Sequence, residues 1–171
     1  MVKIGEEAPG FELEGVLNGK FKKFALRDYK GKWLVVFFYP LDFTFVCPTE
    51  IREFSQHTKD FKKLKTEIIG VSVDSVHSHN AWIEGSLGKI HYPLLSDFHK
   101  TMSEDYDVLL EDEGVALRGT FIIDPKGIVR HMIISDNDVG RSVKETLRVV
   151  GALQTGKLCP VEWKKGQKTL N

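Results

Sequence analysis

The fold is decided between Trp33 and Lys65, where the chain reads WLVVFFYPLDFTFVCPTEIREFSQHTKDFKKLK. Residues 33–39 form a continuous apolar run rich in β-branched and aromatic side chains, which predicts a buried strand. Pro40 ends this strand, because proline cannot donate a hydrogen bond to a sheet. The apolar side chains that follow fit one face of a helix over residues 48–65, and they are Ile51, Phe54, Phe61 and Leu64. Cys47 therefore stands at the junction between a strand and a helix.

The position of Cys47 favours reactivity. Pro48 suits the first position of a helix and Glu50 suits its first turn. The thiolate is the nucleophilic form of cysteine, and a helix N-terminus with a nearby cation stabilises it. Thr44 lies three residues earlier and is placed to bring a hydroxyl beside the sulfur. The alternative is a buried cysteine that acts as a small apolar side chain. Position alone leaves both interpretations open.

The segments on either side of this stretch predict a sheet with mixed strand directions. A second apolar run at residues 67–74 gives the order strand, helix, strand, which predicts a parallel βαβ unit. Residues 11–17 and 20–26 flank Asn18-Gly19, a pair typical of hairpin turns. Residues 75–84 are expected to form a helix capped by Ser75 and interrupted at residues 85–88. A short strand at 91–97 and a short helix at 100–106 follow.

The C-terminal third of the chain predicts a second hairpin and a helix. Residues 118–124 and 128–134 flank Pro125-Lys126-Gly127 and are expected to pair antiparallel. Residues 139–153 show apolar positions on one helical face. We therefore expect an α/β fold with a central mixed β-sheet flanked by helices, an N-terminal β-hairpin and a C-terminal tail. Residues 1–155 would form one domain, and the polar tail, residues 156–171, would dock on it through a few apolar side chains.

Composition excludes several classes of function. Lysine plus arginine and aspartate plus glutamate number 24 each, so no net charge attracts nucleic acid. No stretch approaches the ~20 apolar residues that a membrane-spanning helix needs, and residues 1–7 do not resemble a secretory signal. Cys47 and Cys159 each lack a neighbouring cysteine, and His77 and His79 are interpreted as part of a solvated loop. We expect a soluble cytoplasmic protein without a metal or cofactor, which binds neither nucleic acid nor membranes.

Pro40, Thr44 and Cys47 stand in the pattern Pro-x-x-x-Thr-x-x-Cys. This pattern resembles the active-site signature of the peroxiredoxins, thiol peroxidases built on a thioredoxin-like fold. The flanking residues 37–40 and 46–50 resemble the typical two-cysteine subgroup, which includes the bacterial alkyl hydroperoxide reductases. The resemblance extends over nearly the whole chain. It implies a thioredoxin-like fold and the reduction of hydrogen peroxide and organic hydroperoxides.

The resemblance also implies roles for individual residues. Cys47 would attack one peroxide oxygen, Thr44 would hold a peroxide oxygen through its hydroxyl, and Pro40 would shield the sulfur from water. Arg118, at the start of a predicted strand, matches the arginine of the family, whose fixed donors suit the thiolate and the transition state better than a lysine would. Without the motif around it, Arg118 would be interpreted as a surface cation at a strand end.

Three more residues match positions that support this site in similar proteins. Glu50 and Arg141 correspond to residues that orient the catalytic arginine, and Trp82 corresponds to a tryptophan that packs nearby. Judged without the resemblance, Glu50 and Arg141 are equally well interpreted as solvated helix charges. Trp82 would look the same as an ordinary core aromatic residue.

Cys159 lies in the sequence LCPVEW at residues 158–163, which resembles the motif of a resolving cysteine. A sulfenic acid on Cys47 would condense readily with a second thiol. In similar proteins that thiol comes from the partner chain, which implies an intersubunit disulfide and a homodimer, often five dimers in a ring. The implied reductant is thioredoxin or a flavin-containing disulfide reductase.

Other functions fit the sequence less well. A thioredoxin-like disulfide carrier needs Cys-x-x-Cys, whereas Cys47 is followed by Pro48-Thr49-Glu50. A cysteine phosphatase places arginine six positions after its nucleophile, and residue 53 is glutamate here. A ring-forming holdase chaperone, a side activity of some similar proteins, remains as the structural alternative to an enzyme.

Overall fold

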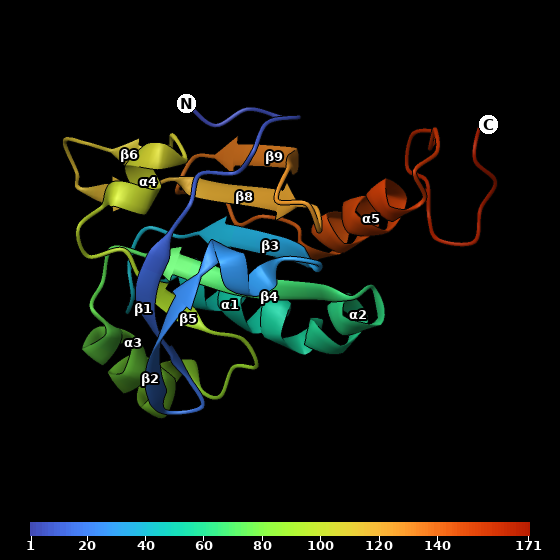
Figure 1. The fold of residues 1–171 in the computed structure, drawn as a ribbon. Helices are drawn as coiled ribbons and strands as arrows, with labels where there is room; N and C mark the ends of the chain where they lie inside the picture. The colour runs from blue at the N-terminus through green and yellow to red at the C-terminus, as the bar shows by residue number, and fades with distance from the viewer.

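The computed structural model describes residues 1–171, and its centre is a seven-stranded mixed sheet with the strand order β2-β1-β5-β4-β3-β8-β9 (Figure 1). The strands of this sheet are β1 (Glu12–Leu17), β2 (Lys20–Ala25), β3 (Trp33–Phe38), β4 (Thr66–Ser72), β5 (Leu94–Ser96), β8 (Arg118–Ile123) and β9 (Val129–Ser135). The strands β6 (Leu109–Leu110) and β7 (Val115–Ala116) form a separate small hairpin. The mixed sheet confirms the predicted α/β architecture, including the hairpin of β1 and β2.

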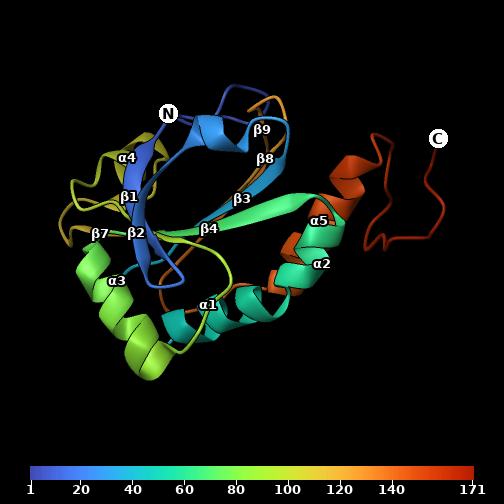
Figure 2. The ribbon, with the colours of Figure 1, turned by 60° about the horizontal axis from the view of Figure 1, so that its bottom comes forward.

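The helices cover both faces of this sheet. They are η1 (Leu26–Tyr29), α1 (Cys47–Gln56), α2 (Thr58–Lys63), α3 (Val76–Trp82), η2 (Ile83–Leu87), α4 (Thr101–Asp105) and α5 (Val143–Gln154). In Figure 2, α1, α2 and α5 lie on one side of β3 and β4, and α4 lies on the other side with the N-terminal segment. None of these helices combines the length and the apolar character that crossing a bilayer requires.

Strand β3 is the centre of the core because both of its faces are buried. Val35, Phe37 and Tyr39 point into the core beneath α1 and α5, and they are not exposed at all. The alternate residues Leu34, Val36 and Phe38 point into the opposite core, which α4 and the N-terminal segment close. β3 pairs in parallel with β4 and antiparallel with β8. This double burial explains why the strand reads as a continuous apolar run without alternation.

The single helix predicted over residues 48–65 is two helices. Ile51, Phe54 and Phe61 are fully buried on the predicted apolar face, but the helix breaks at His57. The hydroxyl of Thr58 donates to the carbonyl oxygens of Ser55 and Phe54, at 2.8 and 3.3 Å. Such bonds from a threonine side chain compete with the helical backbone bonds and bend helices.

Two other helix boundaries differ from the prediction. The last helix starts at Val143, not at residue 139, because the side chain of Ser142 caps it by accepting from the Glu145 amide. Val139 is 67 % exposed and lies outside this helix. The helix that Ser75 caps was expected to reach Glu84; α3 ends at Trp82 and continues as the π-helical turn η2.

The interpretation of His77 and His79 as a solvated loop was wrong, because both lie on α3. His79 is completely buried, and its Nδ1 lies 2.7 Å from Oδ2 of Asp42. Its Nε2 lies 3.0 Å from the carbonyl oxygen of Leu95, which can only accept. The ring of His77 instead packs edge-on against Phe21. No group of three or more His, Cys, Asp or Glu side chains is arranged to hold a metal ion.

Candidate active site

Cys47 is the first residue of α1, and its side chain is completely buried at the end of β3. The chain leaves the sheet at Tyr39, whose amide still bonds to the carbonyl of Val71 in the neighbouring strand. Seven residues then lead back beneath the sheet to Cys47. Cys47 therefore lies at the positive end of the α1 dipole, which favours negative charge nearby.

Arg118 supplies the nearest cation. It is the first residue of β8, and its Nη1 lies 3.5 Å from Sγ of Cys47. β8 runs antiparallel to β3, with Phe37 opposite Thr120, so the beginning of β8 lies beside the end of β3. The carbonyl oxygen of Asn137 accepts from Nε and Nη2 of Arg118, at 3.0 and 2.8 Å. Three of its nitrogens are therefore bound to fixed partners, which holds the guanidinium in place.

Glu50 connects Arg118 to Arg141. Its Oε2 accepts from Nη1 of Arg118 at 2.7 Å, and its Oε1 accepts from Nε of Arg141 at 2.8 Å. The Arg141 backbone amide also donates to Oε1, at 2.9 Å. Arg141 reaches the sheet through further bonds to the carbonyl oxygens of Gly119 and Phe38, at 2.8 and 2.5 Å. The three side chains are at most 4 % exposed.

Without a negative charge on the sulfur, positive charges outnumber negative charges in this buried group. Two guanidinium groups face one carboxylate, so an ionised Cys47 would make the group neutral. Burial lowers the pKa of Arg141, and its hydrogen bonds to Glu50 oppose that shift. Tyr92 adds no charge, since burial raises its pKa well above the ordinary value. A buried set of charges is tolerated best when it is balanced, so this network can accommodate one further negative charge beside Arg118.

Thr44 and Pro40 lie on the segment between β3 and Cys47. Both are half-buried. The hydroxyl of Thr44 donates to the carbonyl oxygen of Leu41 at 2.9 Å, and no hydrogen bond joins it to Cys47. Its oxygen keeps free lone pairs, and its hydrogen becomes available if the side chain rotates away from Leu41. The structure thus places Thr44 near the start of α1 but does not bring it into contact with the sulfur.

Trp82 packs on the segment before Cys47 and belongs to the same buried core cluster as Cys47. Its ring is 2 % exposed and lies 5.7 Å from the ring of Phe43 and 6.3 Å from that of Tyr39. Beside it, Asp42 accepts from the hydroxyl of Tyr39 at 2.8 Å and faces His79. The segment from Tyr39 to Phe43 is therefore anchored to α3 on two sides.

Cys159 lies at the other end of α5 from this network. It is half-exposed, and its sulfur lies 3.4 Å from Oγ1 of Thr155 and 3.7 Å from the carbonyl oxygen of Ala152. Arg141 precedes the first turn of the same helix, whose 12 residues span about 18 Å. Figures 1 and 2 show the tail beyond the end of α5. A disulfide needs Cα atoms within about 7 Å, so this arrangement does not bring the two cysteines of one chain together.

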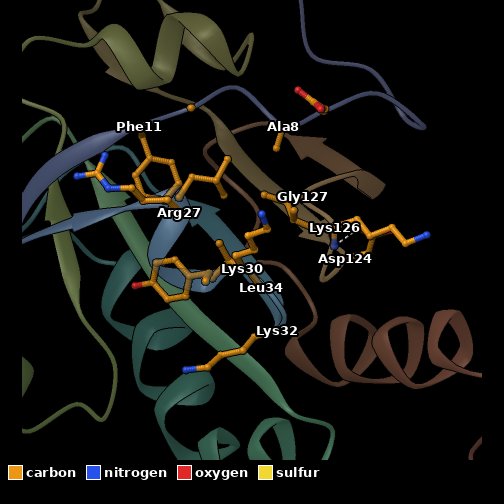
Figure 3. Close-up of a pocket in the computed structure, with 14 residues that line it drawn as sticks. Ala8, Phe11, Arg27, Lys30, Lys32, Leu34, Asp124, Lys126 and Gly127 are labelled. Carbon is orange, nitrogen blue, oxygen red and sulfur yellow. Dashed lines mark hydrogen bonds between the residues drawn. The ribbon is translucent and has the colours of Figure 1, made fainter.

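A hollow of about 390 Å³ lies at the other end of β3 from Cys47 (Figure 3). Its floor includes Leu34, from the beginning of β3, and Ile123, from the end of β8. Lys30 and Lys126 line its rim, and neither forms an ion pair. This hollow is separated from Cys47 by the length of the strand.

Several supporting residues were missed by the sequence analysis. Asn137 acts through its carbonyl oxygen, which any residue type supplies, so no side-chain pattern marks it. The only signal was its place in the polar turn Asp136-Asn137-Asp138. Asp42 and His79 lie 37 positions apart, and only their burial together identifies them as a pair.

The chain matches known proteins over nearly its full length. The model of the AhpC/TSA family matches residues 4–132. Peroxiredoxin-2 of Mus musculus is 52 % identical over 177 residues, which cover 98 % of this chain and 89 % of the relative. Putative peroxiredoxin YkuU of Bacillus subtilis is 52 % identical over 175 residues, which cover 98 % and 97 %. The crystal structure of reduced Plasmodium vivax 2-Cys peroxiredoxin superposes with a TM-score of 0.94 at 41 % identity, covering 97 % of this chain and 91 % of that one.

Proposed function

Because the chain belongs to the AhpC/TSA family and is a typical two-cysteine peroxiredoxin with a thioredoxin-like fold, we propose that Cys47 is the residue that reduces the peroxide. Its thiolate attacks one oxygen of a hydroperoxide, and the O–O bond breaks. Cys47 becomes a sulfenic acid, and the second oxygen leaves as hydroxide or alkoxide and takes up a proton. The products are water, or an alcohol when the substrate is an organic hydroperoxide.

The observation that supports this proposal is the 3.5 Å contact between Arg118 and the sulfur inside the network held by Glu50. The guanidinium stabilises the thiolate, and its donors are already oriented toward the oxygens on which charge develops. Glu50 and Arg141 act as positioning residues, because they hold Arg118 and touch neither substrate nor sulfur. Thr44 would turn its hydroxyl from Leu41 to a peroxide oxygen. Pro40 would limit access of water, and Trp82 would hold the segment that carries both.

The second step requires a thiol from another chain. Cys159 condenses with the sulfenic acid of Cys47 in a partner subunit, which forms a disulfide and releases water. The distance along α5 supports this route over one within a single chain. Residues 156–171 act as the unit that carries Cys159. A dithiol reductant, thioredoxin or a flavin-containing disulfide reductase, then restores both thiols. Such thiols persist in a reducing compartment, which fits a cytoplasmic location.

The open edge of the sheet supports a homodimer. Val129 exchanges backbone hydrogen bonds with Gly5 and Glu6 of the N-terminal segment, but beyond Val129 β9 pairs only with β8, so the rest of its other edge presents free amide and carbonyl groups. Ile133 and Ile134 are 50 and 39 % exposed on this strand. An exposed edge with apolar side chains is a template for pairing with another strand, and β9 of a second copy would continue the sheet. Five such dimers would form the ring implied by the resemblance.

The test uses two variants, separately and mixed. Wild type consumes hydrogen peroxide rapidly in a stopped-flow assay with excess reductant, and Cys47→Ser does not. Neither Cys47→Ser nor Cys159→Ser alone forms a disulfide-linked dimer on a non-reducing gel. Exchanging subunits of the two variants and adding peroxide gives a dimer with one disulfide if the bond joins two subunits. A monomer with an internal disulfide in wild type, or a fast reaction of Cys47→Ser, would contradict the proposal.

A further inference from the structure

The tail is the most basic part of a chain that is neutral as a whole. Residues 156–171 contain one acidic residue, Glu162, and four lysines, while the other residues include 20 basic and 23 acidic side chains. The lysines are Lys157, Lys164, Lys165 and Lys168, and all are exposed. Positive charge is therefore concentrated on the segment that carries Cys159.

The docked tail adds its charge to that of α5. A groove of about 600 Å³ lies between α2, α5 and the tail. Two of its cations are neutralised, since Lys63 pairs with Asp60 at 3.3 Å and Arg148 pairs with Glu145 at 2.6 Å. The other three cations at the groove have no acidic partner, and they are Lys144, Lys164 and Lys165. We call the five unpaired lysines of α5 and the tail the basic tail face, and they are Lys144, Lys157, Lys164, Lys165 and Lys168.

Resting on the function proposed above, we propose that the basic tail face is the docking surface for the reductant, a dithiol protein whose surface around its thiols is acidic. Cys159 is the half-exposed cysteine and Cys47 the buried one, so a protein reductant reaches the disulfide from the side of Cys159. Four lysines stand within nine residues of Cys159 in the sequence. They therefore remain near its sulfur even when the tail leaves α5 to form the intersubunit disulfide.

One dithiol is sufficient to reduce the disulfide between Cys47 and Cys159 by thiol–disulfide exchange. A thiolate of the reductant attacks Sγ of Cys159, and the Cys159–Cys47 bond breaks. Cys47 leaves as a thiolate, which the Arg118 guanidinium stabilises, and a stabilised thiolate leaves faster. The second thiolate of the reductant then attacks the mixed disulfide and releases Cys159, which takes up a proton. The reductant is oxidised to its disulfide, and two electrons pass to the peroxidase.

Opposite charges at such a surface act mainly on the rate of encounter. They steer association and make its rate fall as salt increases. The Debye length is about 10 Å at 0.1 M salt, which leaves the effect measurable at low ionic strength. A small uncharged dithiol feels no such attraction, so it separates docking from chemistry.

The experiment compares charge reversal on the tail with the same reversal elsewhere. The variant K164E/K165E changes two unpaired lysines of the basic tail face. The control K30E/K126E changes two unpaired lysines at the hollow on the other face of the sheet from α5 (Figure 3), with an identical change in net charge. A thioredoxin with an acidic surface around its thiols serves as reductant. A charge-neutralised variant of that thioredoxin, in which asparagine and glutamine replace those acids, is the second arm.

With the acidic thioredoxin at about 20 mM salt, kcat/KM for the reductant should fall about tenfold in K164E/K165E and stay near the wild-type value in the control. The difference should shrink at about 300 mM salt and with the neutralised thioredoxin. An equal effect of both variants, or no effect of either, would overturn the proposal. Turnover of peroxide with dithiothreitol and disulfide formation after peroxide addition report the proposed function itself. If wild type neither turns over peroxide with dithiothreitol nor forms the disulfide, the peroxidase assignment is wrong. If it does both but charge reversal on the tail has no effect, only the proposed docking surface is wrong.

Discussion

Glu50 and Arg118 form an ion pair of 2.7 Å, and each side chain is 2 % exposed. An ion pair buried so completely has lost the hydration of both charges, so its geometry and its other hydrogen bonds decide whether it is stable. Glu50 meets this requirement by accepting from Arg141 as well. The guanidinium of Arg118 is thereby fixed 3.5 Å from the sulfur before any substrate arrives. Such preorganised donors are the main source of electrostatic catalysis.

Replacing Arg118 tests the contact with the sulfur. In Arg118→Gln the rate constant of Cys47 with hydrogen peroxide should fall by about 100-fold or more, since removal of one preorganised donor has an effect of that size. Stopped-flow measurement of a single turnover reports this step alone. The control is Arg52→Gln, because Arg52 lies on α1, the helix that begins with Cys47, and binds the carbonyl oxygens of Leu87 and Ser86 instead. Equal rates for Arg118→Gln and wild type would show that the guanidinium does not act on the sulfur.

Replacing Glu50 tests the carboxylate that holds both arginines. Glu50→Gln removes the carboxylate that both buried guanidinium groups pair with, and breaking a buried ion pair costs about 3–5 kcal/mol of the free energy of unfolding. Urea unfolding of the reduced protein measures this loss. The matched control is the exposed Glu113, whose substitution by glutamine should stay within about 0.5 kcal/mol of wild type. A loss in Glu50→Gln no larger than the control's would contradict the importance of the network for stability.

The sequence predicted those features that local patterns determine. The strands of the seven-stranded sheet, its hairpins β1–β2 and β8–β9 and the parallel pair of β3 and β4 follow from apolar runs and turn residues, whereas the small hairpin of β6 and β7 was not predicted. The break at His57 was missed because it arises from Thr58, a residue compatible with either outcome. Cys47 and Arg118 are 71 positions apart, and no periodicity joins them. They meet because β8 runs antiparallel to β3, and only the resemblance to a known family pointed to Arg118 beforehand.

The partly buried position of Asp74 predicts a pH effect on stability. Burial and the nearby charge of Asp42 raise the pKa of Asp74, although the Ser72 hydroxyl donates to it at 2.6 Å. An acid whose pKa is raised in the folded state holds its proton at pH values at which the unfolded chain releases it. Unfolding then releases a proton, so this group lowers stability as pH rises above about 4.

Asp74→Asn removes this titration and keeps an oxygen that accepts from Ser72 and from the Asp42 amide. The variant should therefore gain stability relative to wild type as pH rises from about 4 to about 7. Urea midpoints across this range measure the gain. Asp112→Asn, at an exposed position, is the control and should show no such trend. If the difference in stability between Asp74→Asn and wild type stayed constant with pH, the raised pKa of Asp74 would be refuted.

The buried side chain of Trp163 is expected to hold the tail on the domain. Its side chain is 4 % exposed, and its carbonyl oxygen accepts from Nη1 of Arg148 at 3.1 Å. Trp163→Ala removes the main apolar anchor of residues 156–171, and truncation of a buried tryptophan costs about 3–5 kcal/mol. Amide hydrogen exchange in the tail should accelerate by at least about tenfold, while exchange in β3 and β8 stays unchanged. The intersubunit disulfide should also form faster after peroxide addition, because Cys159 spends more time away from α5.

Val161→Ala is the matched control, since Val161 is 92 % exposed in the same segment. If exchange in the tail were equal in Trp163→Ala and Val161→Ala, contacts other than Trp163 would have to hold the tail on the domain.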